Sequence, residues 1–145
     1  RLKQGTHMSA KFVDPASLPT WTFDWGIIKP LIATDNTDAG HCSLMHVILF
    51  PGKGHDRHNH PESDEILYIL SGRGDQMIDD GEPAPVVPGD AVWIPKGVWH
   101  STLNTSYEPM VILAVYAPAG AEDVLKTLPD FTAVPAGSNP SVARS

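Results

Sequence analysis

Cysteine, long apolar runs and positive charge are all scarce in this sequence of 145 residues. The single cysteine, Cys42, excludes a disulfide framework and any metal cluster held by thiolates. No apolar run approaches the roughly 20 residues that a membrane-spanning helix needs. With 10 basic against 17 acidic residues, the formal charge is −7, and no basic stripe is available to displace counterions from phosphates. We therefore expect neither a membrane protein nor a nucleic-acid binder.

The two ends of the sequence look different from its middle. Residues 1–7 (RLKQGTH) precede Met8 and read as the remnant of a cloning junction. No secretory pattern follows Met8, so we expect a cytoplasmic location. Residues 132–145 are rich in Pro, Ala, Gly and Ser and predict a flexible tail.

Helical periodicity is almost absent between residues 21 and 117. Short β-branched and aromatic runs are separated there by Gly, Pro and Asp, which is typical of an all-β sandwich or barrel. The strands that we expect cover residues 43–50, 65–70, 75–79, 91–94, 101–104 and 110–116. One short helix is predicted over 121–128, ended by Pro129. The sequence thus predicts one domain, with an N-terminal arm and first strands over 8–43, a barrel over 44–118 and a helical segment over 119–131.

The predicted strand 65–70 is apolar on both faces. Leu67 and Ile69 share one side with Glu65, whereas Ile66, Tyr68 and Leu70 share the other. A strand with two apolar faces needs a cover on its outer side. Either the N-terminal arm, with Trp21, Phe23 and Trp25, or a second subunit supplies that cover, and we expect a homodimer formed through this sheet.

Histidine is the residue type that points to chemistry. Five of the seven histidines lie between residues 41 and 60. His58 and His60 are two apart, so on an extended chain both rings leave the same face. Glu65 follows at an odd offset, but Pro61 and the polar residues 62–64 interrupt the strand and allow the phase to reset. His100 begins another predicted strand after a Pro-containing turn.

Two stretches of the sequence carry a family resemblance. Residues 52–72 follow the pattern G-x5-H-x-H-x4-E-x6-G, and residues 89–104 follow G-x5-P-x-G-x2-H-x3-N, with 16 residues between them. Every position of both patterns is occupied, and together they resemble the two signature motifs of the cupin superfamily. The resemblance implies a small jelly-roll β-barrel, to which the predicted short C-terminal helix is attached. It also implies one metal ion, held by His58, His60, Glu65 and His100, and a supporting role in the fold for Asn104.

The chemistry of this ligand set agrees with the resemblance. Three imidazoles and one carboxylate suit Fe, Mn, Ni, Co, Cu or Zn, and no soft sulfur is present. A six-coordinate ion would keep two positions for other ligands, whereas a tetrahedral zinc would be saturated. Fe(II) or Mn(II) is therefore favoured for an enzyme. A fold relic that has kept these residues without binding metal is the alternative.

The remaining aromatic and basic side chains leave several roles open. His46, on a predicted strand, and Trp99, next to His100, are candidate pocket residues. His55 lies in the Gly-rich turn before the first motif, and we expect it at the surface. The basic residues near the motifs lie in turns or have the wrong parity for a buried anion clamp, namely Lys53, Arg57, Arg73 and Lys96.

These observations favour an enzyme that holds a small oxygenated substrate, such as a dicarbonyl, keto acid or sugar, on its metal by two oxygens. Among the reactions that this mode serves, a dioxygenase is favoured, with a sugar isomerase, decarboxylase or lyase as the alternative. A cupin that binds a metal or sugar without catalysis is the second alternative, because the fold alone does not choose a reaction.

Overall fold

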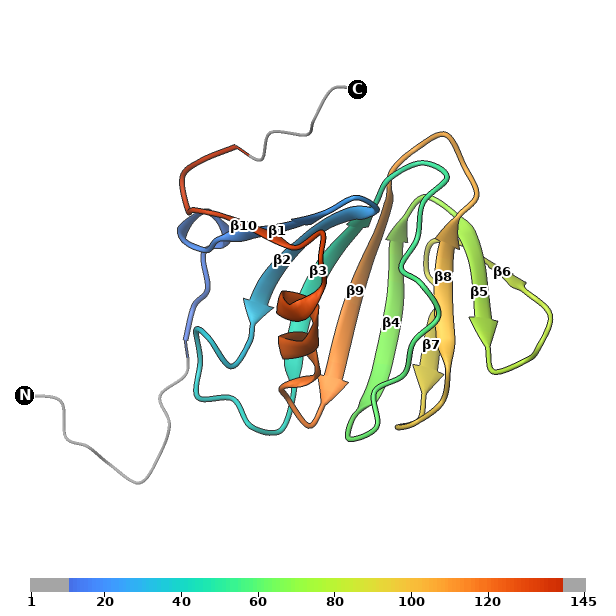
Figure 1. The fold of residues 1–145 in the computed structure, drawn as a ribbon, viewed down its shortest axis with the longest axis horizontal. Coiled ribbons are helices and arrows are strands. Elements are labelled where there is room, and N and C mark those ends of the chain that lie inside the picture. The colour runs from blue at the N-terminus through green and yellow to red at the C-terminus, as the bar shows by residue number, and fades with distance from the viewer. Residues whose placement is uncertain (1–10, 140–145) are drawn as a thin grey trace, which may run out of the picture.

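The computed structural model describes residues 11–139, which form two antiparallel sheets (Figure 1). The larger sheet has the strand order β10-β1-β2-β3-β9-β4-β7 and the smaller one β6-β5-β8. The strands are β1 Thr20–Phe23, β2 Gly26–Ile32, β3 Ser43–Leu49, β4 Asp64–Ser71, β5 Gly74–Ile78, β6 Ala84–Val86, β7 Ala91–Ile94, β8 His100–Asn104, β9 Met110–Ala117 and β10 Thr132–Val134. Two short 3₁₀ helices, η1 (Pro15–Ser17) and η2 (Ala121–Thr127), complete the fold. The all-β jelly roll is confirmed.

Each of the six predicted strands is present, with its ends displaced by no more than one residue. The predicted C-terminal helix is also present, but as the 3₁₀ helix η2. One prediction for the chain end is wrong, because residues 132–134 form strand β10 within the proposed tail. β10 pairs with β1, so that Thr20 lies opposite Val134. Such a long-range pairing leaves no trace in local composition. The proposed remnant at residues 1–7 and the end of the tail, 140–145, lie outside the described residues.

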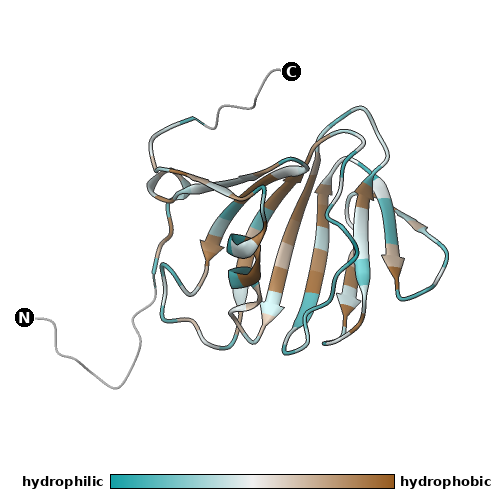
Figure 2. Ribbon diagram, viewed as in Figure 1, coloured by the Kyte–Doolittle hydropathy of each residue, from teal (hydrophilic) through white to brown (hydrophobic). Residues whose placement is uncertain are grey.

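The hydrophobic core lies on the inner face of the larger sheet. Met45, Ile69 and Met110 on β3, β4 and β9 are completely buried there. Apolar residues recur along these strands, as Figure 2 shows by their brown bands. This alternation is expected of antiparallel strands that bury one face. Among the described residues, no helix is long and apolar enough to span a membrane.

The outer face of β4 is not covered by the N-terminal arm. Ile66, Tyr68 and Leu70 are 41–45% exposed. Trp21 and Phe23 belong instead to the buried core. The reason is the strand order: β1 lies next to the far edge strand β10, and three strands (β2, β3 and β9) separate it from β4. The sequence allows two covers for this face, the N-terminal arm or a second subunit. The structure shows that the arm does not cover it.

The chain between β3 and β4 runs alongside the smaller sheet. Isolated bridges pair Gly54 with Leu103 and His58 with His100. A side chain at Gly54 would collide with the Thr102 carbonyl oxygen, so the close approach requires glycine. Residues 54–58 therefore act as a further edge beside β8 and bring the first motif against the second.

Candidate metal centre

Four side chains from three segments converge between the two sheets. They are His58 and His60 before β4, Glu65 in β4, and His100 at the start of β8. One ligand atom from each lies within 4.8 Å of every other. His60, Glu65 and His100 are at most 6% exposed, whereas His58 is half-buried. The convergence that the motifs predict is therefore present in the structure.

Backbone pairing explains why the histidines face each other. The His58 amide donates to the His100 carbonyl at 3.0 Å, and the His100 amide donates to the His58 carbonyl at 2.8 Å. The His60 carbonyl accepts from the Gly97 amide at 2.9 Å. A turn at Pro61 and Glu62 then precedes β4, so Glu65 joins the inward face despite its odd offset.

Two of the imidazoles are oriented through their second nitrogen. His58 Nδ1 lies 2.7 Å from the Asp56 carbonyl oxygen, and His100 Nδ1 lies 2.9 Å from the Val98 carbonyl oxygen. A carbonyl oxygen only accepts, so each Nδ1 carries the hydrogen and donates it. The Nε2 atoms of both rings are thereby left with free lone pairs, which is the form in which histidine binds a metal.

The inner ends of the buried side chains form an unusual polar cluster. His60 Nε2 lies 2.9 Å and His100 Nε2 lies 2.8 Å from Glu65 Oε2. None of these three atoms has a hydrogen-bond partner of acceptable geometry among the described residues. Buried polar atoms without partners are costly, and here all three point to one small region. The cluster, with its nitrogen and oxygen donors, fits a divalent transition-metal ion.

The protonation of the cluster follows from burial and from the contacts within it. Burial alone raises the pKa of the Glu65 carboxyl, but the His100 and His60 rings against it outweigh burial and hold that pKa at about 2. Burial, together with the His55 and His100 rings, lowers the pKa of His58 to about 3. Both groups are therefore in the form that a cation needs, an ionised carboxylate and a neutral imidazole.

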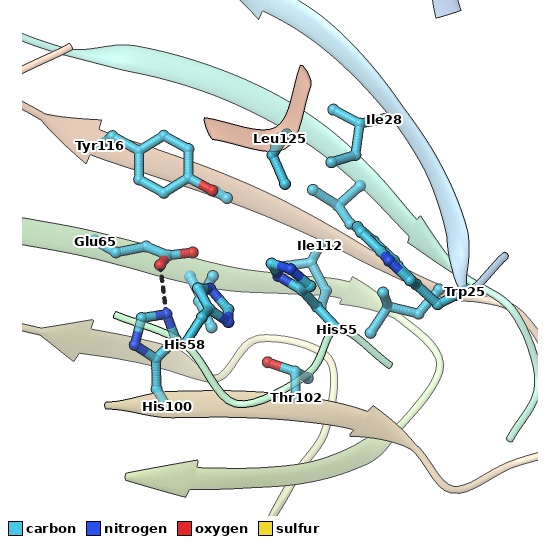
Figure 3. A pocket seen from close by; sticks show the side chains of 14 residues that line it. Trp25, Ile28, His55, His58, Glu65, His100, Thr102, Ile112, Tyr116 and Leu125 are labelled. Atoms are coloured by element: carbon cyan, nitrogen blue, oxygen red, sulfur yellow. Dashed lines mark ion pairs between the residues drawn. The ribbon is translucent and has the colours of Figure 1, made fainter. Parts of the chain in front are cut away.

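Three of the four residues, His58, Glu65 and His100, line one end of a cavity. Figure 3 shows Glu65 and His100 at that end, while Trp25 lies at the opposite end with His55 beside it. The Trp25 and His55 rings are stacked, with centroids 4.8 Å apart. His55 in turn lies 4.0 Å from the His58 ring, centroid to centroid. We call His58, His60, Glu65 and His100 the metal-ligand cluster. Aromatic rings thus extend from this cluster to Trp25 at the opposite end of the cavity.

The other cavity walls are mainly apolar. Leu125 of η2 lies above the cavity, and side chains of β2, β3, β4 and β9 complete its lining. Thr102 and Tyr116 are its other polar side chains. The Thr102 hydroxyl donates to Gln76 Oε1 at 2.5 Å. Burial raises the pKa of Tyr116 well above its usual value, so the hydroxyl remains protonated.

Comparison with known proteins identifies the family. A model described as "Cupin domain" matches residues 45–116. A glucose-6-phosphate isomerase of Thermococcus gammatolerans is 35% identical over 127 residues, which are 79% of this chain and 67% of that protein. The chain belongs to the cupin superfamily.

Two further comparisons show how widely this cupin shares its sequence and fold. A gentisate 1,2-dioxygenase of a Ralstonia species is 34% identical over 68 residues, which are 47% of this chain and 19% of that protein. The structure of a predicted oxalate decarboxylase from Thermotoga maritima superposes with a TM-score of 0.65 at 23% identity and covers 74% of this chain and 99% of that one. The chain spans 49% of a second glucose-6-phosphate isomerase, from Thermococcus kodakarensis.

The two predicted pocket residues lie outside the cupin cavity. On β3, Met45 and Leu49 face inward, and His46 points to the outer face, where it lines a separate apolar hollow with Lys29. Trp99 is 44% exposed and packs under the Arg57 guanidinium, which lies 5.3 Å from its ring centroid. Strand pairing decides which face of β3 His46 takes and in which direction Trp99 points. The sequence alone does not determine this pairing.

His55 is the converse case, since the structure contradicts its predicted surface position. Its ring lines the cavity, between those of Trp25 and His58. The pairing of residues 54–58 with β8 turns the ring inward. His55 lies three residues before His58 in a Gly-rich turn, and this spacing does not predict that the two rings face the same side. Trp25 and Leu125 were not predicted as cavity residues either, because both enter from outside the motifs.

Proposed function

We propose that this cupin is a metal-dependent enzyme that binds a small oxygenated substrate through two of its oxygens, and that its reaction is a dioxygenation. One observation carries the proposal: four ligand atoms of mixed nitrogen and oxygen type lie within 4.8 Å of one another, and His58, Glu65 and His100 of this set also line a cavity. A structural metal site would not need a cavity beside it. A divalent ion held there would act as a Lewis acid on carbonyl oxygens and would orient the substrate.

The residues of the chain prepare this site in three ways. The Asp56 and Val98 carbonyls hold His58 and His100 with Nε2 inward. Glu65 supplies one negative charge in a place that water barely reaches. The apolar walls exclude bulk water, which strengthens every electrostatic interaction inside. A substrate that chelates the ion is thereby placed against preoriented groups.

The choice among reactions rests on the lining and on the relatives. The partial match to a gentisate dioxygenase and the apolar cavity support a dioxygenase. The longer match to a glucose-6-phosphate isomerase supports an isomerase as the second candidate. Against that candidate, none of the cavity-lining residues, all within 11–139, is Lys or Arg, so no cation stands ready for a phosphate.

Fe(II) or Mn(II) is the metal that we propose. Both take six ligands, so four protein atoms leave two positions for substrate oxygens, whereas four-coordinate zinc would be saturated. Ni, Co, Cu and Zn also suit the donor set. The protein should be purified without a nickel column before its metal is measured, because imidazole clusters bind Ni and Cu tightly.

Metal binding is tested by two substitutions at the cluster. We expect His58→Ala and Glu65→Gln each to lower metal affinity by at least about tenfold, because each removes one of four ligands. The measurement is metal content by mass spectrometry after dialysis against a weak chelator. His46→Ala is the matched control, since His46 lies on the outer face of the sheet. Full metal content in both cluster variants would refute the site.

The reaction is tested on protein reconstituted with Fe(II) or Mn(II). Oxygen consumption on addition of a dicarbonyl, absent in His58→Ala, is the expected result. Conversion of glucose 6-phosphate to fructose 6-phosphate without oxygen consumption would replace the dioxygenase by the isomerase. Stoichiometric metal with neither reaction would favour the non-catalytic alternative.

We also propose that two copies associate through the outer face of the larger sheet. Ile66, Tyr68 and Leu70 of β4 are exposed there, and Trp93 of β7, which pairs with Ile66, is 67% exposed. These four side chains are uncharged, so contact between two such patches places none of their own like charges against each other. Exposed apolar patches of this kind mark interaction sites. A second copy supplies an equally apolar face, related by a twofold axis.

A further inference from the structure

The cavity is small in comparison with ordinary ligand pockets. It encloses about 50 Å³, whereas pockets for drug-sized ligands hold roughly 300–1,000 Å³. A single water molecule needs roughly 10–15 Å³ of volume measured in this way. The walls therefore admit only a ligand of few heavy atoms beside the metal-ligand cluster.

Leu125, which covers one side of the cavity and is called its roof below, is held in place by hydrogen bonds from its own helix to neighbouring segments. Leu125 is 3% exposed and belongs to η2. On the same element, the fully buried Glu122 carboxylate accepts from Ser43 Oγ at 2.9 Å, from the Gly120 amide at 2.9 Å and from the Thr34 amide at 3.2 Å. The three hydrogen bonds to Glu122 fix η2 against the barrel, and they thereby fix Leu125, three residues further along the same helix.

The end wall is fixed by stacking. Trp25 lies between two rings: the Phe23 centroid is 4.6 Å away at an interplanar angle of 12°, and the His55 centroid is 4.8 Å away at 22°. Such a stack leaves Trp25 little freedom to swing aside. The distance between the metal-ligand cluster and this wall sets the length of any bound molecule.

Charge limits the ligand further. With a divalent cation bound, the three imidazole ligands are neutral and the Glu65 carboxylate carries one negative charge, so the site has one net positive charge, which a monoanion neutralises. A phosphate would add negative charge among lining residues that include no Lys or Arg in the described chain, and an uncompensated buried charge is expensive. Sugar hydroxyls also lack partners along the aliphatic walls.

Building on the proposed function, we propose that the substrate is a short, unphosphorylated chelating oxo compound with an apolar tail, such as a 2-oxo acid, and that Leu125 and Trp25 limit its length. The carboxylate and keto oxygens lie at the metal-ligand cluster, and the tail lies under Leu125 towards Trp25. The phosphosugar chemistry in the name of the Thermococcus relative does not extend to this cavity.

Calorimetric titration tests the length limit without a turnover assay. The probes are pyruvate, 2-oxobutanoate, 2-oxohexanoate and 2-oxooctanoate, added to protein loaded with Mn(II) under anaerobic conditions. We expect affinity to fall at least about tenfold between 2-oxobutanoate and 2-oxooctanoate in the wild type. Leu125→Ala removes the roof, so 2-oxooctanoate should bind at least about tenfold more tightly than to the wild type.

Two further variants keep the test independent of folding defects. Leu125→Phe fills the space under η2 and should weaken 2-oxobutanoate at least about tenfold while metal content is unchanged. Val124→Ala is the matched control, since Val124 is 53% exposed on the same helix and should leave all affinities unchanged. Trp25→Ala should relax the length limit in the same direction as Leu125→Ala.

The outcomes separate this inference from the function on which it rests. Equal affinity for all four acids in the wild type, or no effect of any Leu125 variant, overturns the length limit and leaves metal chelation intact. No binding of any acid to the Mn(II)-loaded wild type overturns this inference, whereas the proposed function fails only if the metal-loaded protein also consumes no oxygen with a dicarbonyl. Glucose 6-phosphate that binds at least about tenfold more tightly than glucose overturns the exclusion of phosphate.

Discussion

At the scale of single residues, Asn104 shows how the second motif supports the barrel. Its side chain is completely buried and is fully used. Nδ2 donates to the Leu49 carbonyl at 3.1 Å and to the Glu108 carbonyl at 2.7 Å, and Oδ1 accepts from the Ser106 amide at 2.9 Å and hydroxyl at 3.0 Å. The residue therefore ties the end of β8 to β3 and to the turn before β9.

Replacement of Asn104 should destabilise the fold without removing the metal ligands. Asn104→Ala leaves buried carbonyl and amide groups unpaired, at a cost of about 2–3 kcal/mol in the free energy of unfolding. Urea denaturation followed by circular dichroism measures this loss. Thr105→Ala, at an exposed neighbouring position, is the control and should change stability by less than about 0.5 kcal/mol. Equal stability of both variants would contradict the supporting role.

At the scale of elements, η2 depends on one buried carboxylate more than on its own helical bonds. Short 3₁₀ segments have poor hydrogen-bond geometry. Glu122 compensates by accepting three hydrogen bonds from Ser43, Thr34 and Gly120. Its exposed neighbour Asp123 forms a surface ion pair with Lys126 at 3.2 Å and accepts a hydrogen bond from the Thr34 hydroxyl at 3.1 Å. The two acidic residues have opposite environments although they are adjacent in sequence.

This contrast gives a matched pair of substitutions. Glu122→Gln replaces one carboxylate oxygen with an NH₂ group, which cannot accept hydrogen bonds from the Ser43, Gly120 or Thr34 donors. We therefore expect a loss of about 1–3 kcal/mol in the free energy of unfolding, and faster amide exchange in η2. Asp123→Asn removes a solvent-screened ion pair and should cost at most about 1 kcal/mol. Hydrogen exchange measured by mass spectrometry reports both. Similar exchange in the two variants would show that Glu122 does not anchor the roof.

At the scale of the whole molecule, the outer face of the larger sheet exposes a group of apolar side chains. The seven-stranded order places β4 and β7 at one edge, with the side chains of Ile66, Tyr68 and Trp93 directed outward. The barrel does not need this face to complete its core, since the inner faces already enclose it. Association of two copies would remove the exposed apolar area from water.

Sedimentation velocity tests the proposed dimer. We expect the wild-type chain to sediment as a dimer and Tyr68→Lys as a monomer, because like charges brought together across a twofold axis cost several kcal/mol. Tyr107→Lys is the control, since Tyr107 is 85% exposed in the turn between β8 and β9 and belongs to neither β4 nor β7. A wild-type chain that is monomeric throughout the concentration range would refute the interface.

The strands and the metal-ligand cluster could be predicted because their signals are local. Alternating apolar residues and Gly- or Pro-containing turns located six strands to within one residue at each end. His58, His60, Glu65 and His100 were identified by motif spacing, and the structure brings them together. Strand β10 had no such signal, since three residues of ordinary composition become a strand only by pairing with β1.

The sequence by itself determined the fold class, the ligand set and the acidic, sulfur-poor character of the chain, because these depend on residue identity and short-range spacing. The tertiary structure alone decided which other side chains reach the cavity. Trp25, His55 and Leu125 come together from a turn, a strand-like segment and a 3₁₀ helix, while His46 faces away. The inward or outward direction of each is set by strand pairing and by the packing of distant segments, and local sequence does not encode it.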